Sequence, residues 1–154
     1  MDTVELKNLA IDIVGQSCEL KNKYTSEINS SVNYACIFAH SETEFEILKN
    51  TALQLGNIIK VTPTGPIFHI DSLDTVSGKL KLLKIRLPDK NKQGRGYADF
   101  TVSDYQKFKN EYITRDNFKL ITRKDYEIIG IIDSESNVGT YFADPPMDKQ
   151  LGID

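Results

Sequence analysis

The stretch YACIFAHSETEFEILKNTALQLG, residues 34–56, decides the fold. It opens with six aromatic or apolar residues, which favour a β-strand that ends before His40. Ser41 and Glu44 then have the spacing of a helix-capping box. The apolar positions that follow share one face of a helix: Phe45, Leu48, Ala52 and Leu55. Gly56 supplies the residue that commonly ends a helix, so this stretch predicts a strand followed by a capped helix.

Three further strands are predicted after this helix. They are NIIKV at 57–61, IFHID at 67–71 and KLKLLKIRL at 79–87, joined by short turns. In the third, the apolar alternation changes phase between Leu82 and Leu83, which indicates a β-bulge. Residues 32–88 are therefore predicted to form a βαβββ module.

The same order of elements recurs after a connecting loop at 89–96. Strands are predicted at 97–102, 118–122, 126–132 and 137–143, and Ser103 with Gln106 resembles a second capping box. Short strings also repeat 62 or 63 positions further along: Tyr34-Ala35 returns as Tyr97-Ala98, and Ile70-Asp71-Ser72 as Ile132-Asp133-Ser134. We interpret residues 97–146 as a second βαβββ module that arose by internal duplication.

The fold class predicted is α+β, with two tandem modules related by approximate two-fold pseudosymmetry in one compact domain. An amphipathic helix at 2–22 and a polar linker precede them within residues 1–31, and a tail occupies 147–154. The helices of the two modules are expected to pack on their sheets through Phe45, Leu48, Phe108 and Tyr112.

Composition narrows the possible partners. The net charge of −3 and the pI near 5.4 argue against nucleic acid and anionic membranes as partners. Charged residues interrupt every apolar stretch near the start, so we expect a cytoplasmic protein. Cys18 and Cys36 are expected to be buried, reduced thiols, and the basic cluster of Lys90, Lys92 and Arg95 to belong to a solvated loop.

Two tandem βαβββ modules of this length resemble the vicinal oxygen chelate superfamily, which includes glyoxalase I, extradiol dioxygenases and bleomycin-resistance proteins. The preceding helix, Leu87-Pro88 at the end of the first module and Gly96-Tyr97 at the start of the second resemble the YecM-like branch. The resemblance implies curled mixed sheets around a cleft. It also implies a divalent metal held there by His and Glu from the first and last strands of each module.

The metal-ligand positions that the resemblance implies are Tyr34, Arg86, Asp99 and approximately Tyr141. Only Asp99 is a plausible ligand, and a fixed guanidinium would oppose a cation there. We therefore expect no metal and no other cofactor. His69, His40 or Asp71 could provide alternative ligation, although a lone histidine is more often structural.

The cleft candidates for ligand binding are Tyr34, His69, Arg86, Asp99 and Tyr141. Arg86 and Asp99 are expected to meet in the cleft, either as a structural ion pair or with Arg86 anchoring an anion that Asp99 helps to orient. The function predicted is binding of a small polar or anionic molecule without metal. A metal-dependent isomerase, lyase or dioxygenase is one alternative, and a structural or partner-binding domain is the other.

Overall fold

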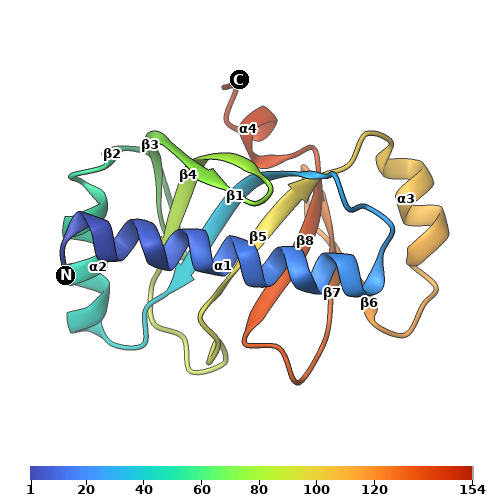
Figure 1. Cartoon of the computed structure of the whole chain (residues 1–154), viewed down its shortest axis with the longest axis horizontal. Coiled ribbons are helices and arrows are strands. Elements are labelled where there is room, and N and C mark those ends of the chain that lie inside the picture. Colours follow the sequence, from blue (N-terminus) through green and yellow to red (C-terminus); the bar gives the residue numbers. More distant parts are fainter. Residues whose placement is uncertain (154) are drawn as a thin grey trace.

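A computed structural model describes residues 1–153 as two βαβββ modules preceded by a long helix (Figure 1). The first module comprises β1 (Ser31–Phe38), α2 (Glu42–Ala52), β2 (Gly56–Thr62), β3 (Gly65–Thr75) and β4 (Gly78–Arg86). The second comprises β5 (Gly96–Thr101), α3 (Tyr105–Tyr112), β6 (Phe118–Thr122), β7 (Glu127–Ile131) and β8 (Val138–Asp144). The predicted α+β fold with tandem βαβββ modules is confirmed.

The strands of both modules join into one mixed sheet, in the order β2-β3-β4-β1-β5-β8-β7-β6. Each module pairs its first and last strands in parallel, β1 with β4 and β5 with β8. The modules meet where β1 and β5 pair antiparallel. Ala35 there faces Ala98, its own equivalent 63 positions on, so the pseudo-two-fold axis passes between these residues.

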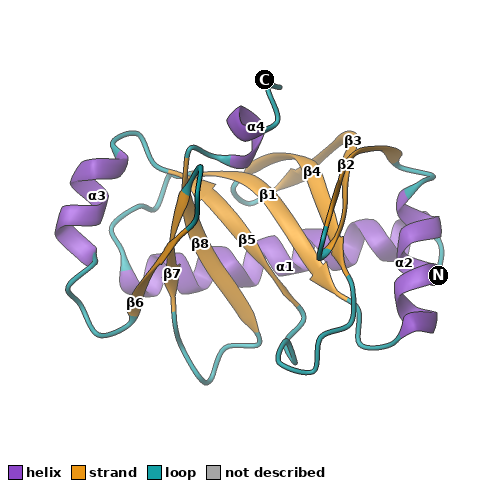
Figure 2. Ribbon diagram, turned by 180° about the vertical axis from the view of Figure 1, so that it is seen from behind, coloured by secondary structure: helices purple, strands orange, loops and turns teal. Residues whose placement is uncertain are grey.

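Helix α1 (Thr3–Tyr24) lies across one face of this sheet and spans both modules (Figures 1 and 2). Two reciprocal hydrogen bonds, each 2.9 Å long, fix it to β8. Ser17 Oγ donates to the Gly139 carbonyl, and Thr140 Oγ1 donates to the Ser17 carbonyl. Lys21 is fully buried, and its ammonium donates to the carbonyls of Glu27 and Ile28. The helix thereby holds the segment that leads into β1.

The main core lies between the sheet and the helices. It includes the four residues predicted to attach α2 and α3: Phe45, Leu48, Phe108 and Tyr112. A smaller apolar cluster on the opposite face contains Tyr34, Cys36, Ile67 and Leu82. Helix α4 (Met147–Gln150) and the following residues pack against it, so this second face is partly covered by the C-terminal segment.

Several local predictions need correction. The side chain that caps α3 is Asp104, which accepts from the Lys107 amide, and not Ser103. Asp104 is the N-cap because the helix begins at Tyr105, one residue later than the sequence pattern predicted. The sheet irregularity is not at Leu82 and Leu83 either: the register shifts between His69 and Leu73 on β3, opposite Leu82 and Leu80. The extra residues are therefore on β3, and the phase of β4 changes just before Leu82.

Two glycines allow strands to approach closely. A Cβ added to Gly96 would lie 2.0 Å from the Cys36 carbonyl oxygen, and one added to Gly65 would lie 2.0 Å from that of Ile85. Both have positive φ, 154° and 141°, which side chains strongly disfavour. Gly96 thus allows β5 to begin directly against β1.

Candidate functional site

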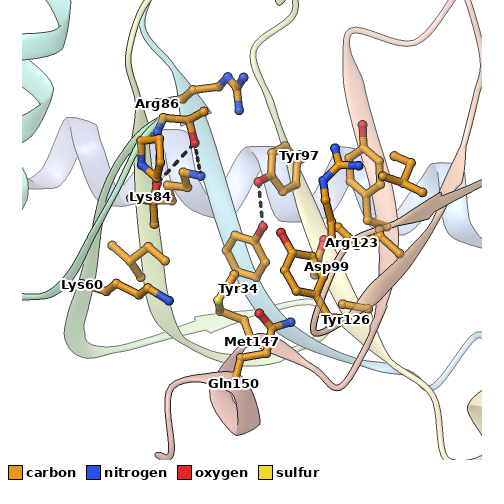
Figure 3. A pocket seen from close by; sticks show the side chains of 18 of the residues that line it. Tyr34, Lys60, Lys84, Arg86, Tyr97, Asp99, Arg123, Tyr126, Met147 and Gln150 are labelled. Carbon is orange, nitrogen blue, oxygen red and sulfur yellow. Dashed lines mark hydrogen bonds between the residues drawn. The ribbon is translucent and has the colours of Figure 1, made fainter.

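A cavity of about 510 Å³ lies on the sheet face opposite α1, and both modules line it (Figure 3). We call it the inter-module cavity. Lys84 and Arg86 of β4 lie on one side of it, Tyr34 and Tyr97 near its middle, and Arg123 on the other side. Its lining is completed by residues of the C-terminal segment, the β2–β3 turn and both sheet edges. The cavity therefore joins residues that are far apart in the sequence.

Cationic side chains dominate this cavity. Five of them line it: Lys60, Lys84, Arg86, Lys92 and Arg123. Among residues 1–153, Asp99 is the only acidic residue in the lining. The protein as a whole carries a formal charge of −3, so the cavity has the opposite sign to the molecule. Such a surface, enclosed by low-dielectric walls, attracts anions.

Asp99 is the buried acid of the inter-module cavity. The residue is 2% exposed, and its Oδ1 atom has no hydrogen-bond partner in the part of the chain that the structure describes. Burial is the main cause that raises the pKa of this carboxyl, and the positive charge of Lys84 opposes it only in part. The resulting pKa is about 8, so the neutral acid and the carboxylate are both accessible near physiological pH.

Lys84 brings a buried cation to the same face. It is 8% exposed, and its ammonium donates a 2.6 Å hydrogen bond to Thr64 Oγ1. Burial lowers the pKa of Lys84. The Cys36 thiol is fully buried, and burial raises its pKa to about 12, which keeps it protonated and unreactive. An ammonium has three N–H donors, and the bond to Thr64 uses one of them, so Lys84 has hydrogen-bonding capacity left for a ligand.

Arg86 is held by Asp89 and not by Asp99. Its Nη2 atom lies 3.4 Å from Asp89 Oδ2, whereas its buried Nε has no hydrogen-bond partner among residues 1–153. The predicted Arg86–Asp99 pair is thus wrong. Arg86 is level with Phe38 on the adjacent strand, and Asp99 lies on β5 opposite Tyr34, so the two charges are separated along the strands as well as across β1.

Tyrosine hydroxyls lie at the junction of the modules. Tyr34 and Tyr97 share a hydrogen bond of 2.7 Å between their hydroxyl oxygens, and their rings meet edge to face. Tyr141 packs edge to face on Tyr97 with 4.9 Å between ring centroids. Burial is the largest cause that raises the pKa of all three phenols, so they remain neutral donors and acceptors.

Four of the five predicted cleft residues line the inter-module cavity: Tyr34, Arg86, Asp99 and Tyr141. The placement of His69 in the cleft is wrong. It is exposed on β3 beyond Ile67, where the cavity ends, because the strand continues past the cavity wall. Lys92 and Arg95 were expected to belong to a solvated loop. Instead, Lys92 lines the cavity, and Arg95 Nη1 lies 2.6 Å from Asp12 Oδ2 of α1. Cys18 is only partly buried.

The cavity residues do not suit a divalent metal. Residues 1–153 contain no group of three His, Cys, Asp or Glu side chains that could hold one. His40 lies elsewhere, with its Nε2 2.8 Å from the Gly94 carbonyl oxygen, and Asp71 is exposed on β3. Around Asp99 the neighbours are cations and protonated phenols.

Pseudosymmetry identifies residues that the sequence reasoning missed. Tyr34 is equivalent to Tyr97, and Cys36 is equivalent to Asp99. The prediction that Tyr34 and Asp99 occupy equivalent positions on the first strands is therefore wrong by two residues. On the last strands, Lys84 pairs with Cys36, whereas Tyr141 pairs with Asp99. The counterpart of Tyr141 is therefore Lys84. Applying the repeat offset strictly to the first strands would have paired Tyr97 with Tyr34.

No family model matches this chain, and no curated protein matches it in sequence. Among solved structures, "Structural Genomics, Protein EC4020" is similar with a TM-score of 0.73 and 9% identity, over 96% of this chain and 92% of that one. A glyoxalase/bleomycin resistance protein/dioxygenase superfamily member from Vibrio splendidus 12B01 is similar with a TM-score of 0.45 and 8% identity, over 73% of this chain and 98% of that one. The likeness to protein EC4020 shows that this chain and that protein share a fold.

No described helix is long and apolar enough to cross a membrane.

Proposed function

We propose that this protein binds a small oxyanion in the inter-module cavity without a metal. The observation that carries the proposal is the cavity's charge: its lining within residues 1–153 has five cationic side chains and one buried acid, in a protein of net negative charge. Oxyanions are ligands that guanidinium and ammonium groups recognise through charge-assisted hydrogen bonds.

Unused hydrogen-bond donors support this proposal. Within the described part of the chain, Arg86 Nε is buried without a partner, and the Lys84 ammonium bonds only the neutral Thr64. Buried polar groups are normally satisfied, and an unsatisfied one costs about 1–3 kcal/mol. A ligand oxygen that accepts from these donors would remove that cost. The tyrosine hydroxyls offer further neutral contacts to a polar ligand.

The test is calorimetric titration with sodium sulfate, inorganic phosphate and citrate. Arg86→Gln is expected to weaken binding at least about tenfold, because a charge-assisted hydrogen bond contributes about 1.5–3 kcal/mol. Arg86→Lys should also lose affinity while stability changes little, since it keeps the charge but loses the planar fork. Lys81→Gln removes the same charge from an exposed position on β4 and serves as the control. Equal affinities in all variants would overturn the proposal.

For lineage and location we propose the vicinal oxygen chelate superfamily, within it the YecM-like branch, and the cytoplasm. The internal repeat and its symmetric strand order support the lineage. A metal-dependent activity of that superfamily has no comparable support here, because the cavity offers cations where metal ligands would be needed. Two free cysteines without a disulfide agree with a reducing compartment.

A further inference from the structure

We propose that Asp99 acts as a neutral acid that donates a hydrogen bond to the bound oxyanion, so that anion binding above pH 8 takes up one proton. This inference rests on the proposed anion binding. It assigns Asp99 the role of a specificity residue: the preferred ligand offers an acceptor oxygen to Asp99, not a hydroxyl donor. It therefore favours fully ionised oxyanions over neutral hydroxylated molecules.

The geometry around Asp99 carries the inference. The residue is 2% exposed in the cavity wall, and its Oδ1 has no hydrogen-bond partner among residues 1–153. It forms no ion pair with Lys84 or Arg86, since the salt bridge of Arg86 goes to Asp89 and Lys84 bonds Thr64. A buried carboxylate without a counter-ion or a hydrogen-bond donor is strongly disfavoured, and the group avoids this cost by accepting a proton. The neutral acid has one O–H donor, which has no acceptor from the described residues.

The titratable groups facing Asp99 come from every neighbouring strand. They are Tyr34 and Cys36 of β1, Lys84 of β4, Tyr97 of β5 itself and Tyr141 of β8. Arg123 and Tyr126, from the turn between β6 and β7, line the same cavity. The phenols and the thiol stay protonated, because burial raises their pKa values. Asp99 is the group whose charge changes near pH 8. Burial lowers the pKa of Lys84, so this residue takes up protons in the same sense, and the Asp99→Asn variant separates the two contributions.

An incoming anion shifts that equilibrium. A negative ligand beside an ionised Asp99 would be repelled, whereas beside the neutral acid it gains a hydrogen bond. Because the pKa of Asp99 is about 8, most of the free protein holds the carboxylate at pH 9. The proton taken up on binding comes from solvent and resides on the Asp99 carboxyl, so no other reactant is consumed. Affinity should then fall about tenfold per pH unit above pH 8.

Sulfate is the suitable probe, since it does not titrate in this range. Calorimetric titrations at pH 9 in Tris and in triethanolamine, two cationic buffers of different ionisation enthalpy, measure the protons taken up. We expect nearly one proton per sulfate for the wild type. Asp99→Asn keeps an N–H donor and should bind sulfate with almost no proton uptake. It should also lose the steep part of the pH dependence, with any weaker slope left from Lys84.

The outcomes separate the two proposals. If sulfate, phosphate and citrate all fail to bind the wild type between pH 6 and 9, the proposed anion binding fails. If sulfate binds without proton uptake, and with the same pH dependence in Asp99→Asn, only the role of Asp99 is overturned. Cooperative unfolding of each variant is checked first. Asp99→Ser, which also offers one donor, replaces Asp99→Asn if that variant does not fold.

Discussion

Replacing Asp99 by Asn should stabilise the protein above pH 6, by an amount that grows with pH. An unfolded Asp titrates near about 3.9, whereas burial raises the pKa of Asp99 to about 8 in the folded protein. Between these values the folded state holds more protons than the unfolded state, so wild-type stability falls as pH rises. The contribution of Asp99 is fully present below the unfolded pKa and is lost as pH approaches the folded pKa.

The magnitude follows from that difference. Each pH unit between the two pKa values costs the wild type up to about 1.4 kcal/mol, which gives an upper limit of about 5 kcal/mol at pH 8. Asn cannot ionise, so Asp99→Asn should lack this slope. Urea unfolding at pH 5, 6, 7 and 8 measures the free energy of unfolding of both proteins.

A matched control isolates burial from charge. Asp71→Asn makes the same substitution at an exposed strand position and should change stability by less than about 0.5 kcal/mol at each pH. Parallel curves for Asp99→Asn and the wild type from pH 5 to 8 would refute the reasoning. Asp99 would then be solvated or paired in solution.

Four further expectations can be tested separately. Gly96→Ala should destabilise by several kcal/mol, since the added Cβ would lie 2.0 Å from a carbonyl oxygen, whereas Gly15→Ala, with open space in α1, should stabilise by about 0.5–1 kcal/mol; chemical denaturation compares them. Lys21→Met should cost at least about 1–3 kcal/mol in the same assay, because two turn carbonyls lose their donor. A double-mutant cycle of Tyr34→Phe and Tyr97→Phe should give a coupling energy of about 1 kcal/mol for their 2.7 Å hydrogen bond, and strict additivity would contradict it. Elemental analysis should find no stoichiometric zinc, nickel, iron or manganese, and about one tightly held metal per chain would contradict the donor set described here.

The fold could be predicted because local signals and the repeat agreed. The Ser41 cap, the apolar face starting at Phe45 and the short β-prone runs each specify one element, and the second module repeats their order. Where the local signals were ambiguous, the predictions shifted by a residue: Ser103 and Asp104 are both good N-caps, and the pattern cannot say which one begins the helix. The register shift opposite Leu82 changes the apolar alternation of β4, but the extra residues that cause it lie on β3.

The cavity was harder to predict than the fold. Tyr34, Arg86, Asp99 and Tyr141 were placed by the resemblance, yet whether Arg86 reaches Asp99 depends on strand register, which one sequence does not define. The remaining cations belong to segments that meet only in three dimensions. Lys60 is on the edge strand β2, Lys92 is in the loop between the modules, and Arg123 follows β6. Nothing in the sequence around each of them distinguishes it from a solvated surface residue.

The most direct test of the central claim is to locate anion binding by NMR. Sodium sulfate is titrated into ¹⁵N-labelled protein at pH 7, where Asp99 is mostly neutral, and amide shifts are followed. We predict saturable shifts concentrated in β1, β4, β5 and β8 around the inter-module cavity, which Arg86→Gln weakens and Lys81→Gln leaves unchanged. Shifts that stay linear with concentration, or that gather on the exposed lysines outside the cavity, would contradict the account.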